Sequence, residues 1–213
     1  MTEKERIADF IVSLEHGQGE LCDEIARKAR AEKVPIIRPE TVSFLQVMTT
    51  LCSPKAILEV GTAIGYSALL MAQVMPEDCR ITTIENYEKR IPRARENFRL
   101  AGMEDRITLL EGDAGLILPE LSGSYDLIFM DGAKGQYIHW LPDVLRLLPA
   151  GGVLISDNVF QDNTIVESRF AVERRDRTIH SRMREYLFEL KHREDLLTSI
   201  VPIGDGVTIS IKR

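Results

Sequence analysis

The stretch Ala56-Ile-Leu-Glu-Val-Gly-Thr-Ala-Ile-Gly-Tyr-Ser67 decides the fold, because an apolar run breaks at two glycines and then resumes with helical spacing. Residues 56–60 form a short apolar run with one acidic residue, which predicts a strand buried on both faces of a parallel sheet. Gly61 and Gly65 allow a tight turn and a close approach of a ligand to the backbone. The helix predicted over 66–75 would direct unpaired N–H groups at that ligand. The stretch therefore predicts a nucleotide-binding turn.

The glycine spacing differs from that of the dinucleotide-binding fingerprint. The pattern Glu59-x-Gly61-x-x-x-Gly65 leaves a looser loop than G-x-G-x-x-G, and a carboxylate before the loop suits a cationic ligand. Together with Tyr66 and Ser67, the pattern resembles motif I of class I S-adenosylmethionine (SAM)-dependent methyltransferases, in particular the catechol O-methyltransferase-like group. The resemblance implies that Glu59 and the loop around Gly61 bind the methionine end of SAM. A turn in another doubly wound protein is the alternative.

Apolar strands alternate with helical segments along most of the chain. Strands are predicted over residues 56–60, 80–85, 106–111, 125–130 and 152–156. This alternation predicts a parallel sheet with helices on both faces. Residues 196–202 and 207–212, joined by Gly204-Asp-Gly206, predict a terminal β-hairpin and an antiparallel strand at the end of the sheet. Five parallel strands and a hairpin resemble the seven-stranded, Rossmann-like α/β fold of class I methyltransferases.

The region before the first strand is predicted to be helical. Pro35 and Pro39 bracket an extended crossing within it. We expect one methyltransferase domain over residues 1–213, with an N-terminal helical cap over 1–53 and an α/β core over 54–213. The cap would cover the site or form a dimer surface, and the resembled family also implies a homodimer. Its helices are predicted over residues 3–15, 20–32 and 40–51.

Composition limits the classes of protein to consider. With 213 residues and 44% hydrophobic content, the chain can bury a sizeable core. Its net charge of −6 gives no global basic field for nucleic acid, which leaves a local patch as the alternative. The three cysteines lack C-x-x-C spacing, which argues against a zinc site or a disulfide framework and fits a reducing cytoplasm. A charged N-terminus without a long apolar run predicts neither signal peptide nor membrane helix.

Other positions are candidates for binding the rest of the cofactor. Glu85 ends the second predicted strand, where a carboxylate can accept hydrogen bonds from both ribose hydroxyls. A solvated strand-end carboxylate is the alternative for Glu85. The resemblance implies that Asp113 and Ala114 approach the adenine ring. It also implies that Ser67 and the backbone of Ile37 lie near the carboxylate of the cofactor.

Two further predicted strands end in oxygen-bearing side chains. Asp131 follows one strand, and Asp157 and Asn158 follow the next. If these strands are neighbours in a parallel sheet, about 4.8 Å apart, their carboxyl ends open into the same crevice. Two carboxylates and an amide oxygen suit Mg²⁺ better than zinc, although a single strand-end Asp is often a helix cap. The three residues match the metal ligands of divalent-cation-dependent O-methyltransferases, and this resemblance also makes Asp131 a catalytic and cofactor-contacting residue.

Lys134 follows Asp131 by three residues and matches the family lysine assigned as the general base. A nearby divalent cation disfavours a protonated ammonium group and also acidifies a coordinated hydroxyl. We therefore expect in-line transfer, in which the deprotonated acceptor oxygen attacks the sulfonium methyl and positioning supplies much of the acceleration. A surface lysine on a loop is the alternative.

Residues 170–193 have a cationic bias. Such a run can form a solvated helix face, or it can form a patch beside the site that binds the phosphates of a nucleic acid. Residues 178–186 and 203–207 resemble a bacterial subgroup that methylates 5-hydroxyuridine at the tRNA wobble position to 5-methoxyuridine. We therefore expect a Mg²⁺-dependent tRNA methyltransferase that acts on the anticodon loop. An O-methyltransferase of small catechol-like or caffeoyl-type hydroxyls is the first alternative, and a noncatalytic cofactor-binding module is the second. The cations are Arg174, Arg175, Arg177, Arg182, Arg184, Lys191 and Arg193.

Overall fold

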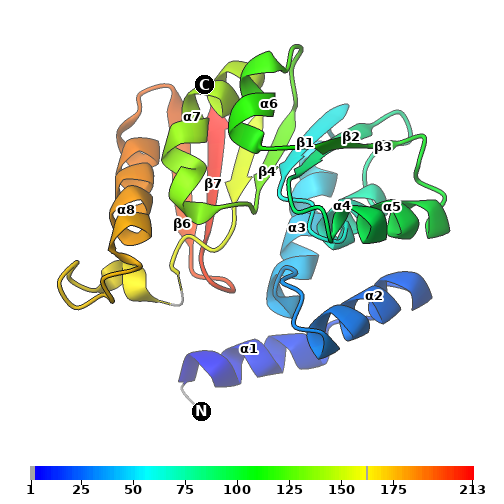
Figure 1. Cartoon of the computed structure of the whole chain (residues 1–213), viewed down its shortest axis with the longest axis horizontal. Helices are drawn as coiled ribbons and strands as arrows, with labels where there is room; N and C mark the ends of the chain where they lie inside the picture. Colours follow the sequence, from blue (N-terminus) through cyan, green and yellow to red (C-terminus); the bar gives the residue numbers. More distant parts are fainter. Residues whose placement is uncertain (1–2, 162) are drawn as a thin grey trace.

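A central sheet organises the molecule, and the computed structural model describes residues 3–161 and 163–213 (Figure 1). Its strands are β1 (Ala56–Val60), β2 (Arg80–Glu85), β3 (Ile107–Glu111), β4 (Leu127–Met130), β5 (Val153–Ser156), β6 (Leu196–Val201) and β7 (Val207–Lys212). The seven strands lie in the order β3-β2-β1-β4-β5-β7-β6. β1 to β5 are parallel, whereas β7 pairs antiparallel with β5 and with β6. The predicted fold, with its terminal hairpin, is confirmed.

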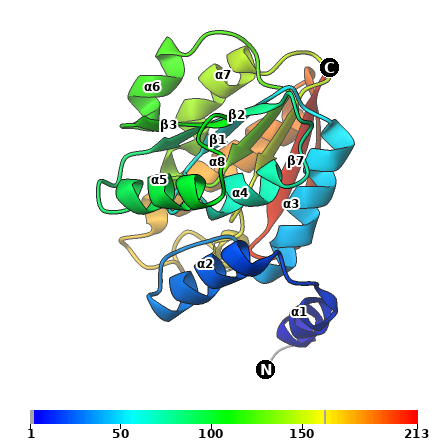
Figure 2. The ribbon, with the colours of Figure 1, turned by 90° about the vertical axis from the view of Figure 1, so that its right-hand side faces the viewer.

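Helices cover both faces of the sheet. Figure 2 shows α6 and α7 on one side of it and α4 and α5 on the other. The alternation of side chains along each strand explains the two layers: Ile57 and Phe129 pack into one buried cluster, and Leu58 and Ile128 pack into the other. The helices are α1 (Glu3–Leu14), α2 (Glu20–Ala31), α3 (Pro39–Cys52), α4 (Tyr66–Ala72), α5 (Ile91–Leu100), α6 (Ala114–Glu120), α7 (Tyr137–Leu147) and α8 (Arg177–His192), with 3₁₀ turns η1 (Lys134–Gln136) and η2 (Thr164–Val166).

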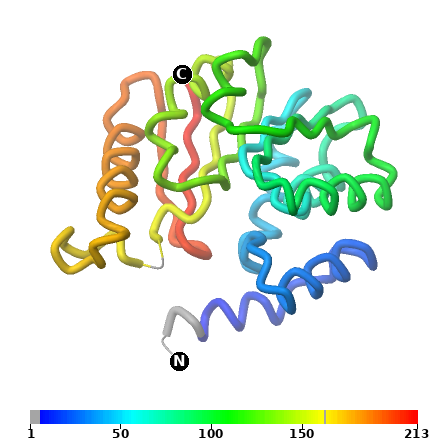
Figure 3. The backbone as a smooth tube through the Cα atoms, viewed as in Figure 1, coloured from blue at the N-terminus to red at the C-terminus, as the bar shows by residue number. Residues whose placement is uncertain are grey.

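The N-terminal helices form where the sequence predicts them. The tube in Figure 3 shows α1 extending away from the sheet, and Phe10 and Leu14 on this helix are each 64% exposed. The connection between α2 and α3 instead turns toward the sheet, where it contributes to the site described below. Within residues 3–161 and 163–213, no helix is both long enough and apolar enough to cross a bilayer.

Strand register determines which side chains meet at the edge of the sheet. Met130 of β4 pairs with Ser156 of β5, so the residues that follow both strands emerge side by side. This neighbourhood of β4 and β5 confirms the sequence prediction. Two predicted boundaries differ by more than one residue: β4 begins at Leu127 and not at Tyr125, and α4 ends at Ala72 and not at Met75. Just before β4, the Asp126 carboxylate accepts the backbone N–H of Lys55 at 2.7 Å, which ties the starts of β1 and β4 together.

Candidate active site

Two cavities open at the carboxyl ends of the parallel strands. The first, of about 400 Å³, lies over the ends of β1, β2 and β4 and is lined by residues that include Gly61, Glu85 and Asp131. The second, of about 510 Å³, lies between the β6–β7 turn and the start of α8. Arg38, Lys134 and Asn158 line both cavities. The two cavities therefore meet at these three residues, which gives room for two ligands in contact with each other.

The glycine loop after β1 packs directly against the end of β4. Gly61 has a φ of +109°, and a Cβ atom at this position would overlap the backbone carbonyl of Asp131. Gly65 has a φ of +82°, and a Cβ atom there would collide with the ring of Phe98. Both positions therefore require glycine, in conformation and in space. The close approach at Gly61 brings the loop and Asp131 to the same cavity wall.

Asp131, Asp157 and Asn158 follow the paired ends of β4 and β5, as expected. Asp157 is 1% exposed, and its backbone N–H donates to Met130 O at 2.9 Å. Burial raises the pKa of the Asp157 carboxyl above its ordinary value, and the negative charge of Asp131 raises it further. The register of β4 and β5 places the two residues at neighbouring strand ends. Asn158 has a φ of +57°, a left-handed conformation that asparagine tolerates better than most residues.

This oxygen set fits a hard divalent cation. The described residues include no group of three or more His, Cys, Asp or Glu side chains that could hold a metal ion, and the predicted set is of another kind because its third member is an amide. A cation beside two neighbouring carboxylates offsets the repulsion between their negative charges. Oxygen donors of this type are those that Mg²⁺ prefers. The assignment of Asp131, Asp157 and Asn158 as metal ligands stays a prediction that the donor chemistry supports.

Lys134 lies at the junction of the two cavities. It begins η1, and its Nζ donates to Asp131 Oδ1 at 2.7 Å. The two side chains are 25% and 18% exposed, so the pair is partly shielded from water. Nearby, the buried hydroxyl of Tyr137 contacts the backbone oxygens of Met130 and Asp157, at 3.0 and 3.3 Å. Tyr137 therefore ties the ends of β4 and β5 together beneath the lysine.

A family model described as O-methyltransferase matches residues 13–213. The chain belongs to the O-methyltransferase family. Among its curated relatives, the catechol O-methyltransferase of Niastella koreensis is 35% identical over 135 residues, a match that spans 62% of this chain and 61% of that protein. The caffeoyl-CoA O-methyltransferase of Medicago sativa is 31% identical over 180 residues, which covers 78% of this chain and 70% of the relative.

Solved structures share the whole fold of this O-methyltransferase. A crystal structure from Staphylococcus aureus that carries the provisional name caffeoyl-CoA O-methyltransferase superposes with a TM-score of 0.90 at 28% identity, over 98% of this chain and 100% of that one. An SAH-bound methyltransferase from Podospora anserina has a TM-score of 0.88 at 26% identity, over 100% and 97% of the two chains. The architecture is therefore that of a methyltransferase from one end to the other.

Glu59 and Ser67 of the O-methyltransferase lie beneath the glycine loop. Glu59 is fully buried and accepts hydrogen bonds from the hydroxyls of Ser67 and Thr83, both at 2.5 Å. Burial raises the pKa of Glu59 to about 7, although these two hydroxyl bonds oppose the rise. Neither Glu59 nor Ser67 is among the residues that line the first cavity. Their structural position is thus a support under the loop, and direct contact with a cofactor stays a prediction.

Glu85 lines the first cavity, as expected for a ribose-binding carboxylate. It is 7% exposed and accepts the backbone N–H groups of Ala63 and Tyr87, at 2.7 and 2.8 Å. These bonds fix the carboxylate at the end of β2. The reading of Glu85 as a solvated strand-end group is wrong, because this side chain is buried between the loop and the cavity.

Of the remaining residues predicted to bind the cofactor, one lines the first cavity, one caps a helix and one packs in the core. Ala114 lines the first cavity, whereas Asp113 caps α6 by accepting the N–H of Gly115 at 2.7 Å. The Ile37 side chain is 4% exposed and packs in the core, while its neighbours Ile36 and Arg38 line the cavity. The crossing between α2 and α3 thus reaches the site, and the contacts of Asp113 and Ile37 with a cofactor stay predictions.

Most of the cations in residues 170–193 have partners within the chain. Arg182 donates to Gly135 O at 3.2 Å, and Arg184 donates to Ile165 O at 3.0 Å. Arg193 pairs with Asp195 at 2.7 Å. Bonds of this kind also engage Arg175, Arg177 and Lys191. Several of these cationic side chains therefore attach α8 to neighbouring segments: Arg182 bonds to the turn η1 that begins at Lys134, and Lys191 bonds to β6.

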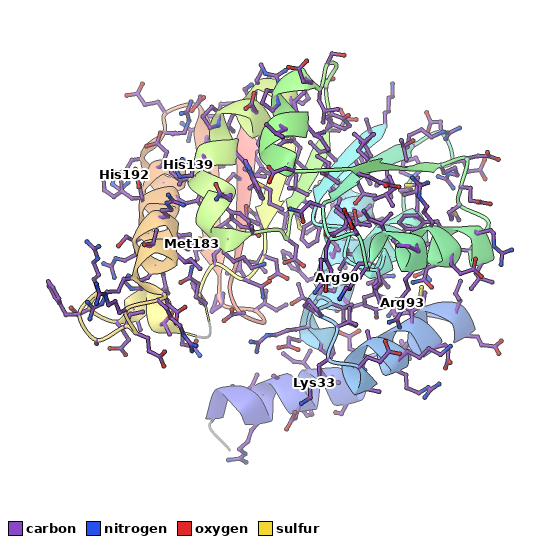
Figure 4. All side chains as sticks on the ribbon, viewed as in Figure 1. Lys33, Arg90, Arg93, His139, Met183 and His192 are labelled. Atoms are coloured by element: carbon purple, nitrogen blue, oxygen red, sulfur yellow. The ribbon has the colours of Figure 1, made fainter. Side chains whose placement is uncertain are left out.

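None of the four histidines is among the residues that line the two cavities. Figure 4 shows His139 and His192 on α7 and α8, apart from Arg90, which lines the first cavity. Sequence reasoning missed Trp140, which lines the first cavity, and Asp205, which lines the second. The Gly204-Asp-Gly206 turn signal identifies the position of Asp205 in the chain, but it does not indicate what this turn faces.

Proposed function

We propose that this chain transfers the methyl group of SAM to a hydroxyl oxygen of an acceptor that carries a second oxygen beside it. Membership of the O-methyltransferase family supports the reaction class, and the SAH-bound Podospora anserina relative supports the cofactor. One observation carries the proposal. A first cavity, which is lined by the glycine loop, by the buried carboxylate of Glu85 and by Asp131, meets a second cavity at Lys134 and Asn158.

Each part of the junction has a task in this reaction. Asp131, Asp157 and Asn158 would hold a Mg²⁺ ion, which would acidify and orient the acceptor hydroxyl while SAM supplies the electrophilic methyl group. Lys134, whose Nζ lies 2.7 Å from Asp131 Oδ1, would accept the proton of that hydroxyl as a neutral amine, the form that a divalent cation beside it would favour. The walls of the two cavities would align the acceptor oxygen with the methyl group, and such alignment supplies a large share of the acceleration.

A small catechol-like or caffeoyl-type hydroxyl is the acceptor that the comparisons favour. Relatives that are 35% and 31% identical carry the names catechol O-methyltransferase and caffeoyl-CoA O-methyltransferase. Two adjacent ring oxygens also suit the proposed metal, because both oxygens can bind one ion. The open second cavity gives access to an acceptor of this size or to the reacting end of a longer one.

The wobble 5-hydroxyuridine of tRNA is the second candidate acceptor. Its 5-hydroxyl lies beside a carbonyl oxygen and offers the same pair of donors, and an anticodon base is already single-stranded. The observation that favours it is the exposure of Arg174 and Arg175 near the second cavity, at the approach to α8. Because Arg175 pairs with Glu173 and six of the seven cations in this region have internal partners, electrostatic support for tRNA is smaller than the sequence suggests.

One competition experiment separates the candidates. Purified protein is incubated with labelled SAM, Mg²⁺ and either catechol, caffeoyl-CoA or bulk tRNA that lacks 5-methoxyuridine. We expect label in a catechol-type product, dependent on Mg²⁺. Label in 5-methoxyuridine with none in either small molecule would reverse the order of the two acceptors. Absence of transfer to all three, with SAM bound, would favour a noncatalytic cofactor-binding module and refute the proposal.

The exposed apolar face of α1 supports the expected homodimer. Phe10 and Leu14 are each 64% exposed, and Ile7 is 54% exposed. Sedimentation velocity of the full chain, compared with a Phe10→Ser/Leu14→Ser variant, measures the assembly. A monomeric wild-type chain at micromolar concentration would rule the dimer out.

A further inference from the structure

Two segments that are far apart in the chain contribute to the wall of the first cavity. Pro35 and Ile36 belong to the connection between α2 and α3, whereas Asn86 and Arg90 belong to the connection between β2 and α5, and all four residues line this cavity. The buried carboxylate of Glu85 lies at the start of the second connection. A link between the two connections therefore affects how a ligand enters and leaves the cavity.

An ion pair joins the first connection to the start of α5. Arg93 Nη1 donates to Glu32 Oε2. Glu32 comes three residues before Pro35, and Arg93 comes three residues after Arg90, so each partner lies close along the chain to a residue of the cavity wall. Figure 4 shows Arg90 and Arg93 near the start of α5, with Lys33 below them. The pair therefore bridges the two segments that contribute to the wall.

A tight turn at the end of α2 sets the direction of the first connection. Val34 N–H donates to Ala29 O at 2.8 Å, and Lys33 N–H donates to Arg30 O at 3.3 Å. Lys33 has a φ of +56°, a left-handed conformation that glycine usually supplies at the end of a helix. Another residue keeps such a conformation only when its surroundings impose it. The ion pair of Glu32, the residue directly before Lys33, is one such restraint.

Water reaches both partners of this ion pair. The side chain of Arg93 is 28% exposed and that of Glu32 is 55% exposed. A pair of this kind shifts an equilibrium by about two- to fivefold, and dissolved salt weakens it. The link between the two connections is therefore weak enough to break whenever a ligand is exchanged, and it is strong enough to slow that exchange measurably.

We propose that the Glu32–Arg93 ion pair holds the connection between α2 and α3 over the cofactor, and that the pair must open before SAH leaves. The inference rests on the proposed function, because it takes the first cavity as the SAM site. Glu32 and Arg93 are positioning residues: neither lines the first or the second cavity, and they act through Pro35 and Ile36. Loss of the pair should therefore speed the release of SAH and leave the chemical step unchanged.

Stopped-flow binding of SAH to the full chain tests the proposal. Trp140 is the single tryptophan of the chain and lines the first cavity, so its fluorescence reports binding and gives the association and dissociation rate constants. We expect Arg93→Gln and Glu32→Gln each to raise the dissociation rate constant about two- to fivefold. An increase in NaCl from about 0.1 M to about 1 M, which shortens the screening length from about 10 Å to about 3 Å, should raise this constant in the wild type and not in the two variants. The single-turnover rate of methyl transfer from saturating SAM should stay within about twofold of the wild type in both variants.

A second ion pair of α5 supplies the matched control. Arg95 pairs with Glu111 at 2.5 Å, and neither residue lines the first or the second cavity. Arg95→Gln should therefore leave the release of SAH and its salt dependence as they are in the wild type. A double variant that exchanges the charges, Glu32→Arg with Arg93→Glu, should restore slow and salt-sensitive release.

The outcomes distinguish this inference from the proposed reaction. An unchanged dissociation rate constant in Arg93→Gln, or an equal increase in Arg95→Gln, would overturn the role of the ion pair. An increase in Arg93→Gln that keeps the salt response of the wild type would overturn it too, because the effect would then come from a general loosening of α5. A wild-type chain that does not bind SAH would refute the proposed function as well, whereas SAH binding with unchanged release would refute this inference alone.

Discussion

Replacing Gly61 with alanine tests whether the glycine loop sets the position of Asp131. At the φ of +109° found for Gly61, an added Cβ would overlap the carbonyl oxygen and carbon of Asp131 and would lie 2.9 Å from the nitrogen of Gly132. These are backbone atoms at the end of a buried strand, so they cannot rotate away as a flexible side chain would. The loop or the strand end must therefore shift.

The cost follows from two terms. A non-glycine residue in this backbone conformation loses about 1–3 kcal/mol, and the forced displacement of packed atoms costs about 1–3 kcal/mol more. We expect Gly61→Ala to lower the free energy of unfolding by about 2–6 kcal/mol. Since a shift of about 1 Å near reacting groups can lower a rate about 100-fold, we also expect methyl transfer by the folded variant to fall by that order.

Gly102→Ala is the matched control, because Gly102 also has a positive φ, +63°, but has nothing within 4 Å of its Cβ position. It should cost about 1–2 kcal/mol of backbone strain and leave methyl transfer intact. Urea unfolding gives the stability of each variant, and transfer from labelled SAM to the preferred acceptor gives its rate. If Gly61→Ala matched Gly102→Ala in stability and the wild type in rate, the close packing of the loop against Asp131 would be wrong.

Three further predictions concern the chemistry of the site. Lys134→Ala should lower turnover by about 100- to 10,000-fold and leave the Kd for SAM within about threefold, because a proton acceptor acts in the chemical step; unchanged turnover would remove Lys134 from the mechanism. The pKa of Glu59 is raised to about 7 in the fold, so protonated Glu59 stabilises the protein fully below about pH 4.5, and this contribution is lost as the pH rises to 7. Between pH 5 and 7.5 the wild type should thus lose about 2 kcal/mol relative to Glu59→Gln in urea unfolding, and parallel curves for the two proteins would contradict the raised pKa of Glu59. Treatment with EDTA should abolish transfer and Mg²⁺ should restore it, whereas full activity in EDTA would exclude the metal assigned to Asp131, Asp157 and Asn158.

The residues of the site that could be predicted are those that directly follow an apolar strand of the parallel sheet. Asp131 and Asp157 each follow a short apolar run, and two such runs in a repeating α/β pattern belong to one parallel sheet. Their meeting at one edge follows from that rule, and the pairing of Met130 with Ser156 confirms it. Glu85 was predictable for the same reason, because it ends β2, which lies in the same sheet and is separated from β4 by β1 alone.

The parts that the sequence could not show depend on partners far away in the chain. Composition reveals the positive charge of Arg182 and Arg184, but their partners are the carbonyls of Gly135 and Ile165, which belong to other loops. The sequence therefore suggested a run of cations that could bind phosphates, but most of these side chains form hydrogen bonds or ion pairs within the chain. Trp140 was missed for a similar reason, because a helical aromatic residue shows no sign of whether it packs in the core or lines a cavity.

The order and direction of the strands explain why two ligands can meet at this edge of the sheet. β1 lies between β2 and β4, so the loop after β1 and the carboxylate after β2 form one cavity with the end of β4. The antiparallel β7 then returns its turn to the same edge beside β5, which supplies the wall of the second cavity. If β7 were parallel, its start and the turn before it would lie at the opposite edge, and Asp205 could not face Asn158. Lys134 and Asn158, which follow β4 and β5, line both cavities, so a change that shifts the register of these two strands should impair methyl transfer with every acceptor.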